Sequence, residues 1–104
     1  MKQYYVWLDD IRVVPYNNYY TFTNVNAVKS FILKKGKGHY ILDLDHDLGE
    51  YSKFGGDGIE LIKWLLNNGY HENKDYKFTF NIHSQNVVGR LNMLALIKRY
   101  FKEN

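Results

Sequence analysis

The chain has 104 residues, of which 45% are hydrophobic, 24% charged and 17% aromatic, and this predicts one globular domain over residues 1–104. One proline and eight glycines exclude collagen-like and mostly disordered chains, and a net charge of +3 permits an anionic partner without requiring one. With no cysteine, disulfide scaffolds, a disulfide-linked partner and thiolate metal sites are excluded, and a reducing cytoplasm is the expected compartment. No apolar run approaches the roughly 18 residues that a membrane helix needs, so no membrane partner is expected.

Four short runs rich in aromatic and β-branched residues predict four β-strands. They cover residues 4–8, 19–23, 39–44 and 77–82. A loop that contains Pro15 connects the first two strands, whereas helical patterns follow the second, the third and the fourth.

The three helical patterns are predicted over about 25–35, 57–68 and 87–102. Thr23 or Asn24 is expected to cap the first helix. Each pattern places apolar residues on one face: Val25, Val28 and Ile32; Ile59, Ile62 and Leu66; Leu94, Ile97 and Phe101.

Crossover connections favour parallel strands, so the fold class is α/β. We expect a mostly parallel four-stranded sheet of order 2-1-3-4 with helices on both faces. A free sheet edge is a weak indication of a homodimer.

Polar residues follow three of the predicted strands at once. Asp9 and Asp10 follow the first strand, residues 45–47 (Asp-His-Asp) follow the third, and residues 83–86 (His-Ser-Gln-Asn) follow the fourth. The carboxyl ends of parallel strands form the usual ligand-binding edge, at the point where the strand order reverses. The three clusters are therefore expected to meet in one cleft.

Carboxylates that converge in one cleft repel each other unless a cation lies among them. Asp9, Asp10 and Asp45 are the best-placed ligands, and Asp47 is a further one. Hard oxygen ligands without cysteine favour a divalent ion, with Mg²⁺ or Mn²⁺ expected first.

His46 and His83 are the cleft groups that titrate near neutrality without assistance. They are candidates for acid and base on a phosphoester, with Asp45 as a third catalytic residue. Zinc held by both histidines and an aspartate is an alternative, as is a histidine that only hydrogen-bonds a carboxylate. Asp43 points to the same side of its strand as Asp45, about 6.6 Å deeper, and is ranked below it.

Phosphate oxygens are expected to meet basic and polar groups at the same edge. Arg12 follows the aspartate pair, and Arg90 lies in the first turn of the last helix. That helix begins after Ser84 and Asn86, so its N-terminal N–H groups face the cleft. Each arginine has the alternative of pairing with a cleft carboxylate.

Three motifs resemble the cyclic-phosphate-processing receiver domains, a divergent branch of the response-regulator receivers. Residues 7–15 (WLDDIRVVP) look like the family's WLDDxRxxP motif, and residues 44–49 (LDHDLG) match its LDHDLG motif. Residues 83–93 (HSQNVVGRLNM) resemble its HSxNPVGRxNM block, with Val87 where the family usually has proline. The resemblance spans nearly the whole chain, and its motifs agree in order and spacing.

The resemblance implies a receiver-like, flavodoxin-like fold without a receiver's first helix and fifth strand. It also implies a metal-dependent phosphoesterase acting on 2′,3′-cyclic phosphate ends of RNA or on cyclic nucleotides. Such domains occur in bacteria and phages.

Two rival interpretations remain. A phospho-accepting receiver would use Asp45 as nucleophile and needs a lysine after a fifth strand, which this pattern lacks. The stronger rival is a receiver-like module that binds a nucleotide or a protein without turnover.

Overall fold

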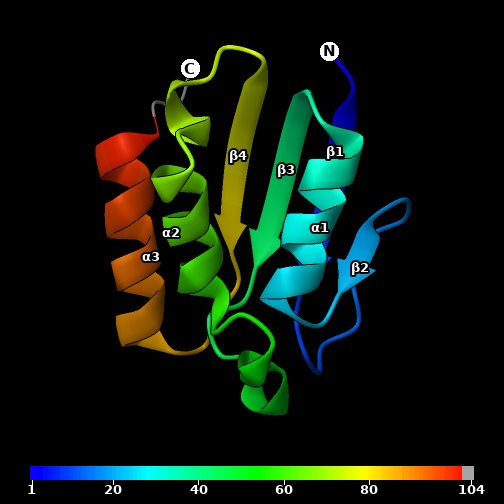
Figure 1. The fold of residues 1–104 in the computed structure, drawn as a ribbon. Helices are drawn as coiled ribbons and strands as arrows, with labels where there is room; N and C mark the ends of the chain where they lie inside the picture. The colour runs from blue at the N-terminus through cyan, green and yellow to red at the C-terminus, as the bar shows by residue number, and fades with distance from the viewer. Residues whose placement is uncertain (102–104) are drawn as a thin grey trace.

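A computed structural model describes residues 1–101 of the chain (Figure 1). In chain order the elements are β1 (Gln3–Leu8), β2 (Tyr20–Phe22), α1 (Val25–Lys35), β3 (Gly38–Leu44), the 3-10 helix η1 (Gly49–Lys53), α2 (Gly58–Asn67), the 3-10 helix η2 (Tyr70–Glu72), β4 (Tyr76–Ile82) and α3 (Val87–Tyr100).

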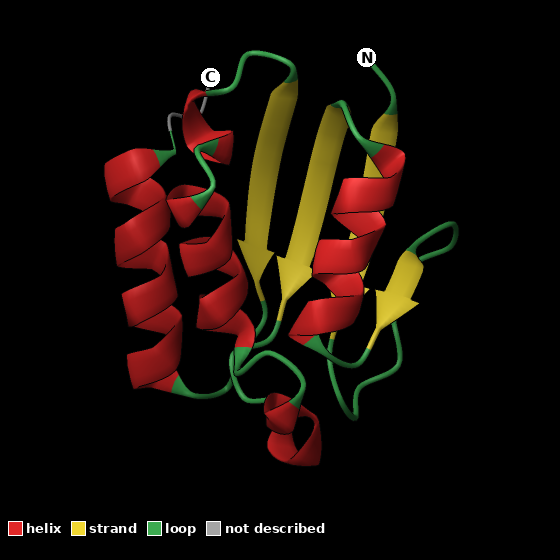
Figure 2. Cartoon of the chain, viewed as in Figure 1, coloured by secondary structure: helices red, strands yellow, loops and turns green. Residues whose placement is uncertain are grey.

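The four strands form one parallel sheet in the order β2-β1-β3-β4, which confirms the predicted topology. β1 lies beside β3 with Leu8 opposite Leu44, and Leu44 is opposite Ile82 of β4. The ends of β1, β3 and β4 are therefore level, and the residues that follow these strands emerge at the same edge (Figure 2).

The hydrophobic core lies on one face of the sheet. Alternate strand residues such as Val6, Leu42 and Leu44 are fully buried there, and the same cluster contains the buried hydrophobic residues of all three helices. In Figure 1, α1 and α2 lie in front of the strands. The expectation that helices cover both faces is therefore wrong, because the loop between β1 and β2 forms no helix that could cover the second face.

The predicted helix faces hold for α1 and shift for the other two helices. Asn24 caps α1 by accepting a hydrogen bond from the Ala27 N–H at 2.9 Å. In α2 the fully buried residues are Leu61, Ile62 and Leu65, whereas the predicted Ile59 and Leu66 are only partly buried. In α3 the buried residues are Gly89, Met93 and Ile97, whereas Leu94 is exposed.

The chain departs from a complete receiver in the two expected places. No helix connects β1 to β2, and no fifth strand follows β4 within residues 1–101. α3 ends at Tyr100, with Phe101 as its cap, and residue 102 of the predicted helix lies outside the described range. Among the described helices, none combines the length and apolar character needed to cross a membrane.

Candidate functional site

A pocket of about 470 Å³ opens at the carboxyl edge of the sheet, where the three polar clusters meet. Its wall brings together most of the residues singled out from the sequence, with Ile11, Gly49 and Gln85 added. The lining residues are Asp9, Asp10, Ile11, Arg12, Asp45, Asp47, Gly49, Ser84, Gln85 and Asn86.

Asp9, directly after β1, is buried and fully hydrogen-bonded. Its Oδ1 accepts hydrogen bonds from the backbone N–H groups of Ile11 and Arg12 at 2.9 and 2.8 Å. Its Oδ2 lies 2.9 Å from His83 Nε2. Burial opposes ionisation of Asp9, but these hydrogen bonds outweigh it and hold the Asp9 pKa below the usual value.

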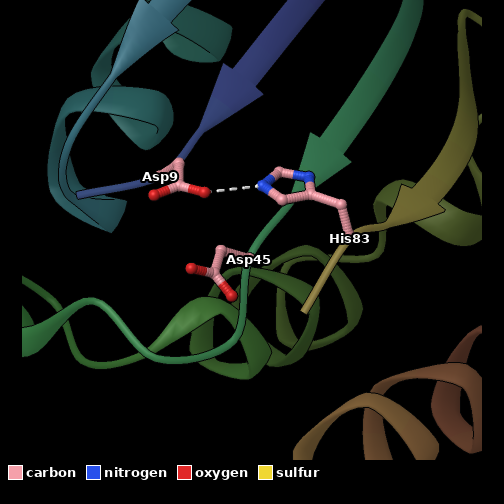
Figure 3. A group of neighbouring side chains, drawn as sticks. All are labelled: Asp9, Asp45 and His83. Carbon is pink, nitrogen blue, oxygen red and sulfur yellow. Dashed lines mark hydrogen bonds and ion pairs between the residues drawn. The ribbon is translucent and has the colours of Figure 1, made fainter. Parts of the chain in front are cut away.

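His83, directly after β4, is clamped between two buried carboxylates. Its Nδ1 lies 2.5 Å from Asp43 Oδ1, and its Nε2 contacts Asp9 (Figure 3). The imidazole also stacks on the Trp7 indole, with ring centroids 4.1 Å apart. Burial alone would lower the His83 pKa, but the hydrogen bonds to Asp43 and Asp9 outweigh it and raise the pKa. These contacts favour an imidazolium between two carboxylates.

Asp45, directly after β3, differs from Asp9 in its electrostatics. Burial and the nearby charge of Asp9 raise its pKa, despite hydrogen bonds from Ser84 and from the His46 N–H. One ligand atom from each of Asp9, Asp45 and His83 lies within 4.8 Å of the other two. Asp45 is therefore harder to ionise than Asp9, first because of its burial and second because Asp9 lies nearby.

His46 points to different neighbours than His83 does. Its Nδ1 lies 2.6 Å from Asp47 Oδ1, and its ring leaves no room for a Cβ on Gly89 of α3. His46 forms a group with Asp47 and Asp57, separate from the group of His83. The zinc site considered from the sequence, with both histidines as ligands, is therefore not formed.

Asn86 and Asp47 fix the start of α3. The Asn86 side chain caps this helix by accepting from the Gly89 N–H at 2.9 Å. Its Nδ2 donates to both carboxylate oxygens of Asp47 at 3.1 and 3.2 Å. These hydrogen bonds from Asn86, with that of His46, lower the Asp47 pKa.

The expected phosphate-binding residues divide into two sets. Arg12, Ser84 and Asn86 line the pocket, and Arg12 Nη1 lies 3.4 Å from the main-chain oxygen of His83. Arg90, one turn into α3, is not among the lining residues. The structure therefore brings one of the two arginines to the pocket.

Sequence reasoning missed two features that position the site and ranked a third, Asp43, too low. Trp7 supports the His83 ring, and Asp43, which was ranked low, is its 2.5 Å partner. Gly58 fits under Asp45, where a Cβ would lie 1.9 Å from the Asp45 main-chain oxygen. In the sequence, the only sign of this contact is a glycine at the start of α2, and its close approach to Asp45 becomes visible in the structure.

The pocket residues fit a hard divalent cation. Four aspartates, 9, 10, 45 and 47, present oxygen atoms to one pocket, and no thiolate is present in the chain. Burial first, and then the charge of Asp9, raises the Asp45 pKa, and a cation would offset the repulsion between the two carboxylates.

Comparison with known protein families gives one match. The model of the cyclic-phosphate processing receiver domain matches residues 4–99, a range that includes all three polar clusters. No curated protein and no solved structure matches the chain. The match confirms the resemblance seen in the motifs. The chain therefore belongs to the family of cyclic-phosphate processing receiver domains.

Proposed function

We propose that the protein is a metal-dependent phosphoesterase that opens cyclic phosphates, either 2′,3′-cyclic phosphate ends of RNA or cyclic nucleotides. The observation that carries the proposal is the Asp43–His83–Asp9 chain of hydrogen bonds beside the pocket carboxylate of Asp45. It supplies a proton-bearing imidazole next to a cluster that fits a divalent cation. The description of the family supports a cyclic phosphate as the substrate.

Asp9, Asp10 and Asp45 would hold the ion, with Asp47 at the edge of the same pocket. When bound, Mg²⁺ or Mn²⁺ would polarise the phosphoryl oxygen and lower the pKa of the attacking water. The hydrogen bonds to both oxygens of Asp9 keep this carboxylate ionised and fix its orientation.

We assign to His83 the role of the general acid that donates a proton to the leaving group. Water loses one proton to the solvent as its oxygen bonds to phosphorus, the bond from phosphorus to one ribose oxygen breaks, and that oxygen takes the Nε2 proton of His83, which regains a proton from the solvent. The raised His83 pKa keeps this proton available near neutral pH, and Asp43 holds the ring through Nδ1. Because Nε2 rests on Asp9, the proton must leave this contact during the reaction.

The remaining phosphate oxygens are assigned to other groups that line the pocket. The Arg12 guanidinium and the Ser84 hydroxyl both line it. The Asn86 amide is engaged by Asp47, so its contribution is to hold the start of α3 and the N–H groups there. His46 is treated as a positioning residue for Asp47.

The test is incubation with a 2′,3′-cyclic mononucleotide and with a short RNA that has a cyclic end. Reactions contain Mg²⁺ or Mn²⁺ and are repeated with chelator, and ³¹P NMR follows conversion of the cyclic diester to a monoester. We expect turnover that needs the metal and falls at least about 100-fold in His83→Gln. His71→Gln, on η2 at the other end of the sheet, is the matched control and should keep the wild-type rate.

Two outcomes separate the alternatives. Glutamine keeps a hydrogen-bonding side chain but does not titrate, so full activity in His83→Gln would overturn the acid role. No turnover with any metal, while the intact nucleotide still binds, would instead favour the non-catalytic module.

A further inference from the structure

The face of the sheet opposite the helices carries no helix among the described residues, although the β1–β2 loop packs on it at Trp7. Its outward side chains differ from the aliphatic core and include Tyr5, His39, Ile41, Lys77, Thr79 and Asn81, all exposed or half-buried. This open face is the far side of the sheet in Figure 1.

A line of aromatic rings connects the open face to the pocket. His83 stacks on Trp7, and Trp7 meets the edge of the Tyr16 ring at a centroid distance of 6.3 Å. Tyr16 lies 5.0 Å from Tyr19, which lies 5.3 Å from Tyr5. Tyr16 and Tyr5 remain 49% and 37% exposed, so each has ring surface free for a ligand. We call Tyr5, Tyr16 and Tyr19 the tyrosine track.

The polar groups around the tyrosine track are compatible with a polyanion. On the outward positions of the described strands the single acid is Asp43, which is buried and bound to His83. Lys77 is exposed on β4, and Arg12 lies where the track reaches the pocket. Ile41 is the one aliphatic side chain that faces outward in β3, so the exposed apolar surface of the strands on this face consists mainly of aromatic rings.

We propose that the open face binds single-stranded RNA, with bases stacked on the tyrosine track and the 3′ end in the pocket. Base stacking on tyrosines of an open sheet is a general mode of single-strand recognition, and it tolerates any sequence. The choice of RNA rests on the proposed function, because a 2′,3′-cyclic phosphate requires a ribose. The inference narrows the substrate class from cyclic phosphates in general to the ends of RNA strands.

The first experiment measures binding without turnover. A fluorescein-labelled RNA octamer with a linear 3′-phosphate, which has no cyclic diester to open, is titrated with the protein in Mg²⁺, and anisotropy gives Kd. Tyr5→Thr and Tyr16→Ser each remove one ring, and both residues lie outside the core cluster. We expect Kd to rise at least about fivefold in each variant.

The matched control is Tyr100→Ala, since Tyr100 is 41% exposed but lies at the end of α3, away from the track. It should bind the octamer as the wild type does. Circular dichroism melts of all the variants establish that each is folded.

A second experiment locates the RNA. In ¹⁵N-labelled protein, the octamer should shift the amide signals of Tyr5, Ile41 and Thr79 and leave those of Val28 and Ile32 in α1 unchanged. Unchanged Kd in both track variants, or shifts confined to the pocket or the helices, would overturn the proposal. A dimer in sedimentation that Tyr5→Thr dissociates would overturn it in favour of a second copy of the chain.

Failure of this inference is distinguishable from failure of the proposed function. Octamer binding that depends on the tyrosine track, without opening of any cyclic phosphate, would support the RNA-binding face and overturn the proposed enzymatic function. The opposite result is equal kcat/KM for cyclic mononucleotides and RNA ends, with no effect of Tyr5→Thr on the ratio of the two values. It would support the enzymatic function and overturn the RNA-binding face.

Discussion

The two faces of the sheet are built from the same strands yet carry side chains of opposite character. In β3, Leu42 and Leu44 are fully buried against the helices, while Asp43 between them points to the open face and is held by His83. Successive side chains of a strand point to opposite faces, so core and site residues alternate along one segment.

This division separates stability from chemistry. The helix-covered face consists of interlocked apolar side chains, whose burial is the main source of folding free energy. The other face has no helix over it, and it places the buried Asp43 and the half-buried His83 ring next to the pocket. Four comparisons, three between paired variants and one between two histidines, test how complete the separation is, from the largest expected effect to the smallest.

Asp45→Asn should remove function while leaving the fold intact. We expect at least about a 100-fold loss of kcat/KM on a cyclic phosphate, because a charged ligand for the ion is lost. The raised Asp45 pKa means that ionisation above pH 3.8 costs the folded state stability, so the variant should be more stable in chelator at pH 7. Urea unfolding and initial rates measure both quantities.

Asp75→Asn is the matched control for that variant, since Asp75 forms an exposed ion pair with Lys37 at 3.5 Å. It should change the free energy of unfolding by less than about 1 kcal/mol and leave the rate unchanged. A less stable Asp45→Asn protein in chelator would contradict the electrostatic account of Asp45.

Leu42→Ala and Ile41→Ala compare adjacent residues on the two faces. Leu42 is fully buried, so its truncation should lower the free energy of unfolding by about 2–5 kcal/mol. Ile41 is half-buried on the open face, so Ile41→Ala should lower the free energy of unfolding by about 1 kcal/mol or less. Equal losses in urea unfolding would show that the open face is as tightly packed as the core.

Asn86→Ala and Asn24→Ala compare two side-chain caps, one in the pocket wall and one outside it. Each accepts a hydrogen bond at 2.9 Å from the third residue on, so each substitution should cost about 1 kcal/mol of stability. Only Asn86→Ala should also lower activity, by about tenfold, because Asp47 loses its amide donor. An activity loss in Asn24→Ala of the same size would show that general destabilisation explains both.

The pH dependence should separate His83 from His39, which both lie on the open side. Contacts with Asp43 and Asp9 raise the His83 pKa above 6.5, despite its burial. Its contribution to stability is therefore complete below pH 6.5 and is lost as the pH rises through the raised pKa. Burial, helped by the charge of Lys77, lowers the His39 pKa, so His39 instead costs stability as the pH falls below 6.5.

Imidazole signals in an NMR titration with chelator measure both histidines. The rate on a cyclic phosphate should fall as the pH rises through the His83 pKa, because His83 then loses the proton that it donates. A His83 pKa below 6.5 would contradict the clamped imidazolium.

Much of this protein follows from local sequence. Apolar runs that end in Asp9, Asp45 and His83 define the strands and the edge where they finish, because strand ends and helix caps depend on a few neighbouring residues. Right-handed crossovers then order the sheet, and the three motifs identify the family.

Only the tertiary structure decided which polar groups meet. His83 contacts Asp43 and Asp9 across 40 and 74 positions of the chain, and its side-chain direction depends on packing against Trp7. His46, equally prominent in the sequence, lies against Gly89. Such contacts follow from the register of distant strands and from which connection forms a helix, and the β1–β2 connection, which forms none, leaves one face of the sheet open.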